Sequence, residues 1–385
     1  MSTCVVGVPK ERKQNEGRVG MTPKGVGLVV EAGGEVIIES GAGVLAGFSD
    51  THYLRAGATV ASERKVVWGA ADILVKVKEP IHEEYPYLAA MRGKTLFAYL
   101  HLAGSEKALT EALLRNRITS IAYETVSEVG VGGRVVFPLL VPMSKIAGTQ
   151  SMNAALLRHK SEDVAKLTAV IIGGGNAGEA ALVRALECGI GLIILFETWE
   201  PKMRELVEKY GSEKVFIFPM AMLDHEEMNE FLRVADIFIS APMLPGGQVA
   251  PVVLTKKHFD VMKEGAYISD VSIDQGGSTD YTRWNPTKPG ETVTYGTRKL
   301  VLSAVPNIPG STVPEEATRA LCAATEPHIV AMVAYHLAHQ NDFEAMRTSP
   351  SLRAGLQTWR GWVTNEHVMT KHGLCADYFP LNTVF

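Results

Sequence analysis

Three glycines at GxGxxG spacing form the clearest chemical motif in the chain. Gly173, Gly175 and Gly178 follow an apolar run at 167–172 and precede a helical pattern that continues to 186. In this setting the first glycine permits a tight turn, the second lets the backbone approach a pyrophosphate, and the third allows a helix to pack closely. The motif therefore predicts a dinucleotide-binding turn.

The residues around this turn indicate which dinucleotide it would bind. The helix start at Asn176 and Ala177 offers unpaired N–H groups to phosphates. Glu197 ends the next apolar run, 19 residues after Gly178. A carboxylate at this place accepts hydrogen bonds from the ribose hydroxyls and repels a 2′-phosphate, so the sequence predicts NAD rather than NADP.

Four polar residues follow apolar runs at places where an open α/β sheet forms its ligand crevice. They are Arg18, Lys78, His101 and Asp274. Arginine and lysine can hold a carboxylate, and histidine can act as a general acid or base near neutral pH. An aspartate beside a nicotinamide could orient an amino group or a water. Together they predict hydride removal from a small 2-amino or 2-hydroxy acid.

Each of these residues also has a purely structural interpretation. Arg18 could pair with Glu11 or Glu16, and a single histidine after a strand, such as His101, is commonly structural. Lys76 is expected at a solvated strand edge and is not assigned to the site.

No metal site and no disulfide framework are expected. The cysteines have no CxxC spacing, and His336 and His339 lack a third ligand at motif spacing, so both histidines are expected on a helix surface.

The elements that position these residues alternate between strand and helix. Apolar strands are expected in two series, at 4–8, 35–39, 73–77, 95–99 and 120–124, and then at 167–172, 191–196, 214–218, 236–240 and 267–271. Helical patterns lie between them, which predicts parallel sheets. Long helices are expected at 144–166 and 315–338, and the tail to about 373 is expected to continue helical and to pack on the first domain.

Composition narrows the class of protein. The 385 residues are 46% hydrophobic and 21% charged, which excludes a mainly disordered chain. The net charge of −4 gives no sign of the basic surface that binds nucleic acids or anionic membranes. We found no run of about 18 apolar residues and no signal peptide. The cysteine usage fits a reducing compartment, so a cytoplasmic protein is expected.

Seven segments, taken in order, resemble the alanine dehydrogenase family, which includes the NAD-binding subunit of transhydrogenase. They are GVPKERKQNEGRVGMTP (7–23), VKVKEP (75–80), LFAYLHLA (96–103), TSIAYETV (119–126), PLLVPMSKIAG (138–148), IDQGG (273–277) and PNIPG (306–310). The resemblance spans nearly the whole chain.

The resemblance implies two α/β domains, with an NAD-binding Rossmann domain at 139–308 inserted into a Rossmann-like substrate domain at 1–138 and 309–385. It implies that Arg18 and Lys78 contact the substrate carboxylate and that His101 and Asp274 form the catalytic pair. Further cofactor contacts are implied at Ser144, Glu197, Lys202, Arg283 and Asn307. The implied reaction converts L-alanine, NAD and water to pyruvate, ammonium and NADH in a homo-oligomer.

Departures from the family pattern leave alternatives open. A glycine-rich segment usual before the Rossmann domain is absent, and 218–222 reads FPMAM in place of a Tyr-Ser-rich stretch. A related dehydrogenase or imine reductase acting on another small amino acid is one alternative. A non-catalytic NAD(H)-binding module is the other.

Overall fold

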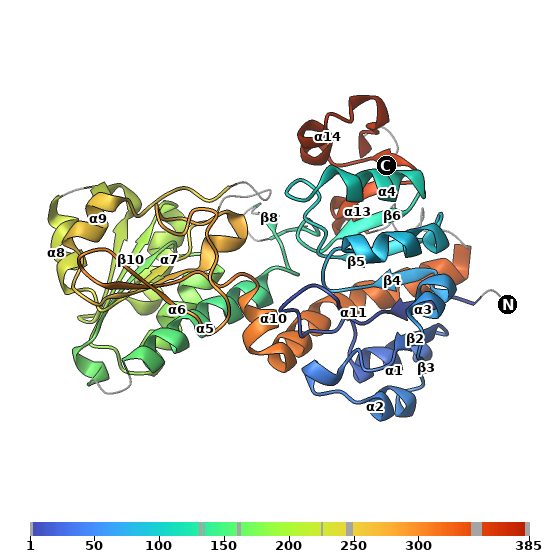
Figure 1. The fold of residues 1–385 in the computed structure, drawn as a ribbon, viewed down its shortest axis with the longest axis horizontal. Coiled ribbons are helices and arrows are strands. Elements are labelled where there is room, and N and C mark those ends of the chain that lie inside the picture. The colour runs from blue at the N-terminus through green and yellow to red at the C-terminus, as the bar shows by residue number, and fades with distance from the viewer. Residues whose placement is uncertain are drawn as a thin grey trace. The chain divides into compact units, whose positions relative to one another are not determined.

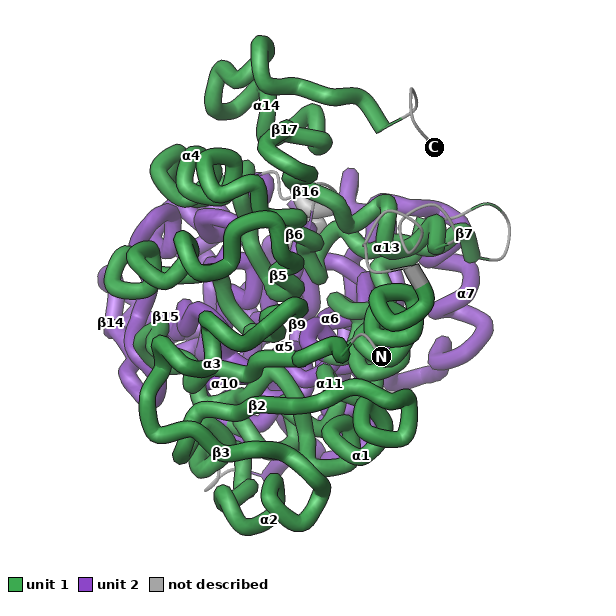
Figure 2. The backbone as a smooth tube through the Cα atoms, turned by 90° about the vertical axis from the view of Figure 1, so that its right-hand side faces the viewer, with its two compact units in different colours: residues 1–142, 313–385 green, residues 143–312 purple. Residues whose placement is uncertain are grey.

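The protein consists of two compact units, as seen in a computed structural model. The structure describes residues 3–130, 133, 135–159, 163–224, 226–243, 249–339 and 349–381. Unit 1 comprises 1–142 and 313–385, and unit 2 comprises 143–312 (Figures 1 and 2). The boundaries expected from the sequence lie four residues earlier at each junction.

Unit 1 is built on one twisted sheet with strand order β17-β16-β6-β5-β4-β1-β2-β3. Strands β1 to β6 run parallel to one another in the order 3-2-1-4-5-6, which is that of a Rossmann fold. The expected Rossmann-like α/β fold is therefore confirmed for this unit. The elements of its first segment are β1 (Val5–Val8), α1 (Pro23–Glu31), β2 (Glu35–Glu39), α2 (Asp50–Arg55), β3 (Thr59–Ala61), α3 (Arg64–Ala70), β4 (Ile73–Val75), β5 (Thr95–Ala98), α4 (Lys107–Arg115), β6 (Thr119–Ala122), β7 (Glu128–Val129) and β8 (Val135–Val136).

The C-terminal segment completes unit 1. Its elements are α11 (Pro314–His339), α13 (Pro350–Ala354), β16 (Leu356–Trp359), β17 (Trp362–Val363) and α14 (Glu366–His372). The expectation that the tail is helical throughout is wrong, because β16 pairs antiparallel with β6 and β17 pairs with β16. The sheet edge left open at β6 satisfies its hydrogen bonds with this returning chain, which outweighs local helical preference.

Local sequence explains where the first helix of unit 1 begins. Thr22 caps α1, since its hydroxyl accepts a hydrogen bond of 3.1 Å from the N–H of Gly25, and Pro23 occupies the first helical position. This cap fixes the start of α1, directly after the segment that contains Arg18. Helix α1 then packs against α11.

Unit 2 has the same strand order with one strand added at its edge. Its sheet runs β11-β10-β9-β12-β13-β15-β14, parallel except for the antiparallel β14. Its elements are α5 (Val141–Arg158), β9 (Thr168–Ile172), α6 (Asn176–Glu187), β10 (Leu192–Glu197), α7 (Glu200–Tyr210), β11 (Val215–Pro219), α8 (Glu226–Val234), β12 (Ile237–Ser240), α9 (Lys256–Val261), β13 (Tyr267–Asp270), β14 (Val293–Tyr295), β15 (Leu300–Ser303) and α10 (Ile308–Thr312). This arrangement confirms the expected Rossmann fold for unit 2.

The long helix expected at 144–166 is wrong at its C-terminal end. Helix α5 ends at Arg158, and a separate 3-10 turn covers Val164–Lys166 after residues that lie outside the described chain. The turn is stabilised by Asp163, whose carboxylate accepts a hydrogen bond from the N–H of Ala165 at 3.2 Å. A capping aspartate begins a new element rather than extending the old one.

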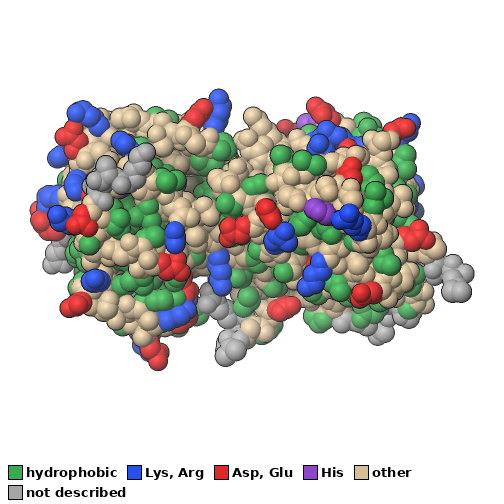
Figure 3. All heavy atoms as spheres, turned by 90° about the horizontal axis from the view of Figure 1, so that it is seen from below, with side chains coloured by type: hydrophobic (Ala, Val, Ile, Leu, Met, Phe, Trp, Pro, Cys, Tyr) green, Lys and Arg blue, Asp and Glu red, His purple; other side chains and the backbone are tan. Residues whose placement is uncertain are grey.

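The central strands are buried on both faces, as continuous apolar runs require. Every residue of β5, β9 and β12 is buried, and apolar side chains of unit 2 form two core clusters. No helix of the described chain has the length and apolarity needed to cross a bilayer. On the face seen in Figure 3, acidic and basic side chains are interspersed rather than gathered in one basic patch.

Candidate active site and dinucleotide-binding turn

Unit 1 gathers three of the predicted site residues around one buried tyrosine. Arg18 follows β1, Lys78 follows β4 and His101 follows β5, and all three side chains border the ring of Tyr99. The ring centre lies 6.0 Å from the Arg18 Cζ and 5.8 Å from the Lys78 Nζ, and the His101 ring stacks on it at 5.9 Å between centroids. Two cations and an imidazole therefore share one small site at the carboxyl ends of the strands.

Glu16 orients Arg18. Its carboxylate accepts hydrogen bonds from Nε at 2.8 Å and from Nη2 at 2.6 Å, and also from the Arg18 backbone N–H at 2.9 Å. Burial alone would raise the pKa of Glu16, but the charge and hydrogen bonds of Arg18, and then the charge of Lys78, lower it to about 2. The structural pairing considered from the sequence is thus present, and it holds the guanidinium in one direction.

His101 is held in an unusual backbone conformation. Its φ angle is +46°, in the left-handed region, and its N–H donates a hydrogen bond of 2.5 Å to Oε1 of Glu124. Desolvation, followed by the positive charges of Lys78, Lys13 and Arg18, lowers the pKa of His101 to about 3. The imidazole is therefore unprotonated and only weakly basic at neutral pH, although 46% of its side chain is accessible.

Glu124 is a site residue that the sequence reasoning missed. It follows β6, the next strand along the sheet, and burial raises the pKa of its carboxyl to about 7 despite hydrogen bonds from the backbone. Its carboxylate also accepts hydrogen bonds from the N–H of Leu100 at 3.2 and 3.3 Å. The available signal was its position at the end of an expected strand, the same signal that identified Lys78 and His101.

Lys76 is buried, and the expectation of a solvated strand edge is wrong. Its side chain is inaccessible, and Nζ lies 3.2 Å from Oε2 of Glu11 and 3.1 Å from Oε1 of Glu84. Glu11 also accepts a hydrogen bond of 2.7 Å from the N–H of Val77. Because an unpaired buried charge is costly, the two carboxylates make burial of this lysine possible, and they hold the segment that ends in Lys78.

In unit 2 the three glycines adopt the geometry their spacing predicts. Gly173 has a φ of +89°, and a Cβ on Gly178 would lie 1.7 Å from the carbonyl oxygen of Gly173. Gly175 is the N-cap of α6 without a side-chain cap, and a Cβ there would meet open space. The N–H groups of Asn176 and Ala177 thus begin a helix at an uncovered turn, which fits a pyrophosphate group.

Glu197 lies at the end of β10 beside this turn. Oε2 accepts a hydrogen bond of 2.7 Å from the N–H of Gly174, and Oε1 accepts bonds from the N–H groups of Thr198 and Trp199 at 2.7 and 2.8 Å. The carboxylate therefore braces the glycine turn. Oε1 also accepts a hydrogen bond of 3.2 Å from the Thr198 hydroxyl, so the acceptor position that remains for a ribose hydroxyl is on Oε2, which has one donor among the described residues.

Lys202 lies in α7 and is engaged in ion pairs. Its Nζ donates to Glu179 at 2.7 Å and to Glu205 at 2.6 Å. Hydrogen bonds from Lys202, Lys209 and Tyr210 outweigh the effect of burial and lower the pKa of Glu179 to about 2. The cluster ties α7 to the first turn of α6, next to the glycine turn.

Asp274 and Asn307 lie together in unit 2. Asp274 is exposed in a 3-10 turn after β13, and its Oδ2 accepts a hydrogen bond of 3.1 Å from the N–H of Asn307, whose φ is +56°. Arg283 donates from Nη1 to the carbonyl oxygens of Ala250 at 2.6 Å and Gly277 at 2.8 Å. It therefore stabilises the loop that follows Asp274.

Ser144 lies half-buried in the first turn of α5, one turn before Gly148. A Cβ on Gly148 would lie 1.9 Å from the carbonyl oxygen of Ala177, so α5 packs tightly against the start of α6. This close packing places the N-terminal half of α5 near the glycine turn.

Two Rossmann-type units, one with a bare glycine turn and one with an arginine, a lysine and a neutral histidine, define the class: a two-domain, dinucleotide-dependent oxidoreductase. Comparisons with known proteins make the class specific. The alanine dehydrogenase/PNT N-terminal domain matches residues 7–147, and the alanine dehydrogenase/PNT C-terminal domain matches residues 143–366. The chain belongs to the alanine dehydrogenase/PNT family.

Individual relatives agree over nearly the full length. Alanine dehydrogenase 2 of Staphylococcus aureus is 37% identical over 375 residues, which cover 94% of this chain and 95% of the relative. Alanine dehydrogenase of Staphylococcus saprophyticus is 38% identical over 376 residues, with the same coverage.

Solved structures extend the likeness to the fold. An L-alanine dehydrogenase has a TM-score of 0.83 and 34% identity, covering 96% of this chain and 99% of that chain. A transhydrogenase from Sinorhizobium meliloti has a TM-score of 0.75 over 94% of this chain and 99% of that chain. It is 20% identical, so it shares the fold.

Proposed function

We propose that this chain catalyses the reversible, NAD-dependent oxidative deamination of L-alanine to pyruvate and ammonium. One observation carries the proposal: Arg18, Lys78 and His101 border a single buried ring, Tyr99. Two cations beside a neutral imidazole suit a small substrate with one carboxylate and a proton to lose. The names of the relatives add alanine as the default substrate.

Arg18 and Lys78 bind the substrate carboxylate in this proposal. The guanidinium is already oriented by Glu16, so little rotamer freedom is lost when the substrate binds. Both side chains are buried, which strengthens their attraction for an anion. They also leave the α-carbon of a short amino acid close to His101.

His101 handles the protons. The deamination needs a base, because the ammonium group must lose a proton before an imine can form and water must lose protons as it adds. A histidine whose pKa is lowered to about 3 is unprotonated at neutral pH, but it is a weak base. A substrate carboxylate held by Arg18 and Lys78 would offset two of the positive charges that lower this pKa, and would make the imidazole more basic when the substrate is bound. We assign Asp274 the role of orienting the amino group or the attacking water.

Bound NAD would accept the hydride that leaves the α-carbon. Gly173, Gly175 and Gly178 form the turn for its pyrophosphate, and Glu197 favours unphosphorylated ribose. The remaining proposed cofactor contacts are Ser144, Asn176, Ala177, Lys202, Arg283 and Asn307. Lys202 would act partly through its ion pair with Glu179 in the first turn of α6.

An absorbance assay for NADH across a panel of L-amino acids tests the proposal. We expect the largest kcat/KM with L-alanine, and formation of NAD from NADH with pyruvate and ammonium in the reverse direction. His101→Ala and Asp274→Ala should abolish turnover while NAD still binds by calorimetry. Unchanged turnover in both variants would exclude the mechanism.

The same panel separates the alternatives. The altered segment FPMAM at 218–222 forms the end of β11 and the turn after it, beside the strand that carries Glu197. A maximum with another amino acid, or with an amine in place of ammonium, would identify a related dehydrogenase or imine reductase. A flat response with normal NAD binding would identify a non-catalytic module.

We further propose a homo-oligomer in a reducing, cytoplasmic setting. The four cysteines are free thiols in the described chain, which fits such a compartment. Light scattering on the eluted protein would give the subunit number, and a monomeric mass would contradict this part of the proposal.

A further inference from the structure

Three side chains with metal-binding atoms converge in unit 1 outside the site described above. They are Cys4, Asp72 and His336, and their ligand atoms all lie within 4.8 Å of one another. They are the one such group of three among the described residues. We propose that they bind a zinc ion that has a structural rather than a catalytic role.

The donor set points to zinc. A thiolate, an imidazole nitrogen and a carboxylate oxygen are the three ligand types that zinc takes in proteins, whereas magnesium and calcium prefer oxygen alone. With bonds of about 2.0–2.3 Å, ligands around a tetrahedral zinc lie roughly 3.3–3.8 Å apart. A closing movement of about 1 Å would bring the present atoms to that spacing. Water would occupy the fourth position, because Asp72 and His336 are only half-buried. Since three protein ligands and a water also occur in catalytic zinc sites, the position of the cluster, and not its number of ligands, indicates the structural role.

Backbone pairing holds two of the ligands in place. Cys4 directly precedes β1 and Asp72 directly precedes β4, and these strands are neighbours in the sheet. Asp72 Oδ2 accepts a hydrogen bond of 2.9 Å from the N–H of Val5, and its own N–H donates to the carbonyl oxygen of Val5 at 2.8 Å. One carboxylate oxygen is thus committed to the backbone, which fixes the direction of the other.

Cys4 is anchored by its neighbours as well. Its carbonyl oxygen accepts a hydrogen bond of 2.8 Å from the N–H of Glu35, and the residue is completely buried. The thiol therefore has little freedom to turn toward solvent. A rigid pair of ligands lowers the entropic cost of binding an ion.

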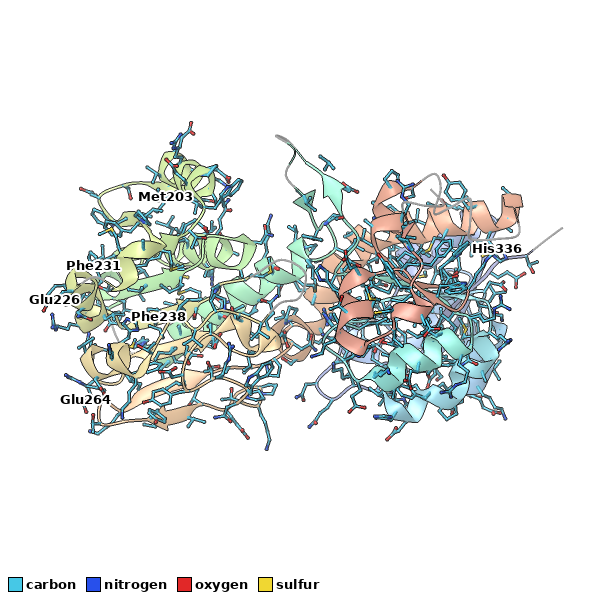
Figure 4. All side chains as sticks on the ribbon, turned by 90° about the horizontal axis from the view of Figure 1, so that it is seen from above. Met203, Glu226, Phe231, Phe238, Glu264 and His336 are labelled. Atoms are coloured by element: carbon cyan, nitrogen blue, oxygen red, sulfur yellow. The ribbon has the colours of Figure 1, made fainter. Side chains whose placement is uncertain are left out.

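His336 comes from a distant part of the sequence. It lies in the last turn of α11, where Figure 4 labels it. The same stretch of α11 packs on the loop before β2: a Cβ on Gly34 would lie 2.8 Å from Val333, and a Cβ on Gly33 would lie 3.5 Å from Leu337. The expected surface position of this histidine therefore holds only in part, since His336 is half-buried and the helix end that carries it is packed against the unit.

The position of the cluster explains why its role is structural. Cys4 and Asp72 lie at the amino ends of β1 and β4, whereas Arg18 and Lys78 follow the carboxyl ends of the same two strands. The ion would therefore lie at the opposite edge of the sheet from the substrate site. It would tie the start of the chain and the end of α11 to the sheet, in a chain whose α11 and β1 are more than 300 residues apart.

Cobalt(II) is a suitable probe because it replaces zinc and absorbs light according to its ligands. The full-length protein is stripped with a chelator, dialysed and titrated with cobalt(II). We expect a thiolate-to-cobalt charge-transfer band in the near ultraviolet, with visible bands of tetrahedral intensity, saturating at one ion per chain. Zinc should displace the cobalt and raise the Tm of the stripped protein.

Variants assign the ligands. Cys4→Ser should remove the charge-transfer band, and His336→Gln should weaken cobalt binding at least about tenfold while keeping the fold. Matched controls are Cys375→Ser and His367→Gln, whose side chains are exposed and lie outside the cluster. Both controls should bind cobalt as the parent does.

Stability and activity provide independent readouts. In His336→Gln, zinc should no longer raise the Tm. In the parent protein, the kcat of the metal-free form should equal that of the zinc-loaded form. The proposal is overturned if the parent shows no charge-transfer band, if the band survives in Cys4→Ser, or if His336→Gln binds cobalt as tightly as His367→Gln. Loss of kcat on chelation, restored by zinc, would overturn the structural role.

Discussion

The carboxylate of Glu124 accepts a hydrogen bond of 2.5 Å from the backbone N–H of His101, and the two residues follow neighbouring parallel strands. The bond secures His101 in a left-handed conformation at φ +46°. Such a conformation costs a non-glycine residue of order 1–3 kcal/mol and persists only where the surroundings determine it. Glu124 is thus a positioning residue for the proposed base.

Glu124→Ala should therefore reduce both stability and turnover. It leaves the N–H groups of Leu100 and His101 without their acceptor, so the free energy of unfolding should fall by about 1–3 kcal/mol. Misplacement of the imidazole should lower kcat roughly 10- to 100-fold. Glu124→Gln retains one acceptor oxygen and should keep most of the stability. Urea denaturation measures the free energy of unfolding, and initial rates give kcat. Equal kcat in the parent and in Glu124→Ala would contradict the positioning role of Glu124.

The positive charge of Lys13 lowers the pKa of His101, so Lys13→Gln should raise that pKa above about 3. At a given acidic pH more of the imidazole is then protonated and less can act as a base. The acidic limb of the kcat/KM profile should move to higher pH. NMR titration of labelled histidine gives the pKa directly. The control is Lys65→Gln, which removes an exposed lysine paired with Glu63. It should leave the pKa of His101 and the acidic limb of the kcat/KM profile unchanged.

Two alanine substitutions in the glycine turn should have different effects. At Gly178 the new Cβ would lie 1.7 Å from the carbonyl oxygen of Gly173, so Gly178→Ala should lower the Tm and NAD binding together. At Gly175, where φ is −66° and a Cβ meets open space, alanine should leave the Tm unchanged. It should still weaken NAD binding, because the methyl group occupies the approach to the pyrophosphate. Tight NAD binding by Gly175→Ala would contradict the assignment of the turn.

Glu197 should determine the choice between NAD and NADP. Glu197→Gln removes the charge that repels a 2′-phosphate but keeps an acceptor for the N–H of Gly174. The ratio of kcat/KM for NAD to that for NADP should fall. Glu197→Ser should lower the same ratio and also the Tm, because it withdraws the brace from the turn. An unchanged ratio in both variants would remove Glu197 from this role.

The buried lysine should be far more sensitive than an exposed one. Lys76→Met leaves the carboxylates of Glu11 and Glu84 buried without a cation, so the free energy of unfolding should fall by about 3–5 kcal/mol. Lys65→Met breaks an exposed pair and should cost less than about 1 kcal/mol. Chemical denaturation gives the free energy of unfolding of each variant. Equal losses in Lys76→Met and Lys65→Met would show that the buried ion pairs of Lys76 stabilise the protein no more than an exposed pair does.

Much of this protein follows from local pattern. The spacing of Gly173, Gly175 and Gly178 predicts their geometry because each needs a property that only glycine has: a positive φ, an open approach or a close packing contact. The runs of apolar residues likewise predict the parallel strands of both units except β3 and β15, since strands buried on both faces carry few polar residues. The polar residues that follow those strands were visible for the same reason.

Tertiary structure decided what these local patterns could not. The sequence does not say that Lys76 meets Glu11 and Glu84, that Glu124 reaches the backbone of His101, or that β16 returns to pair with β6. Each is a contact between separate segments, and its energy comes from satisfying a buried charge or an open hydrogen-bonding edge. Such needs arise only when the chain has folded, because water satisfies every one of these groups in the unfolded chain. Local pattern thus specifies the glycine turn and most of the parallel strands, whereas folding determines which side chains become partners.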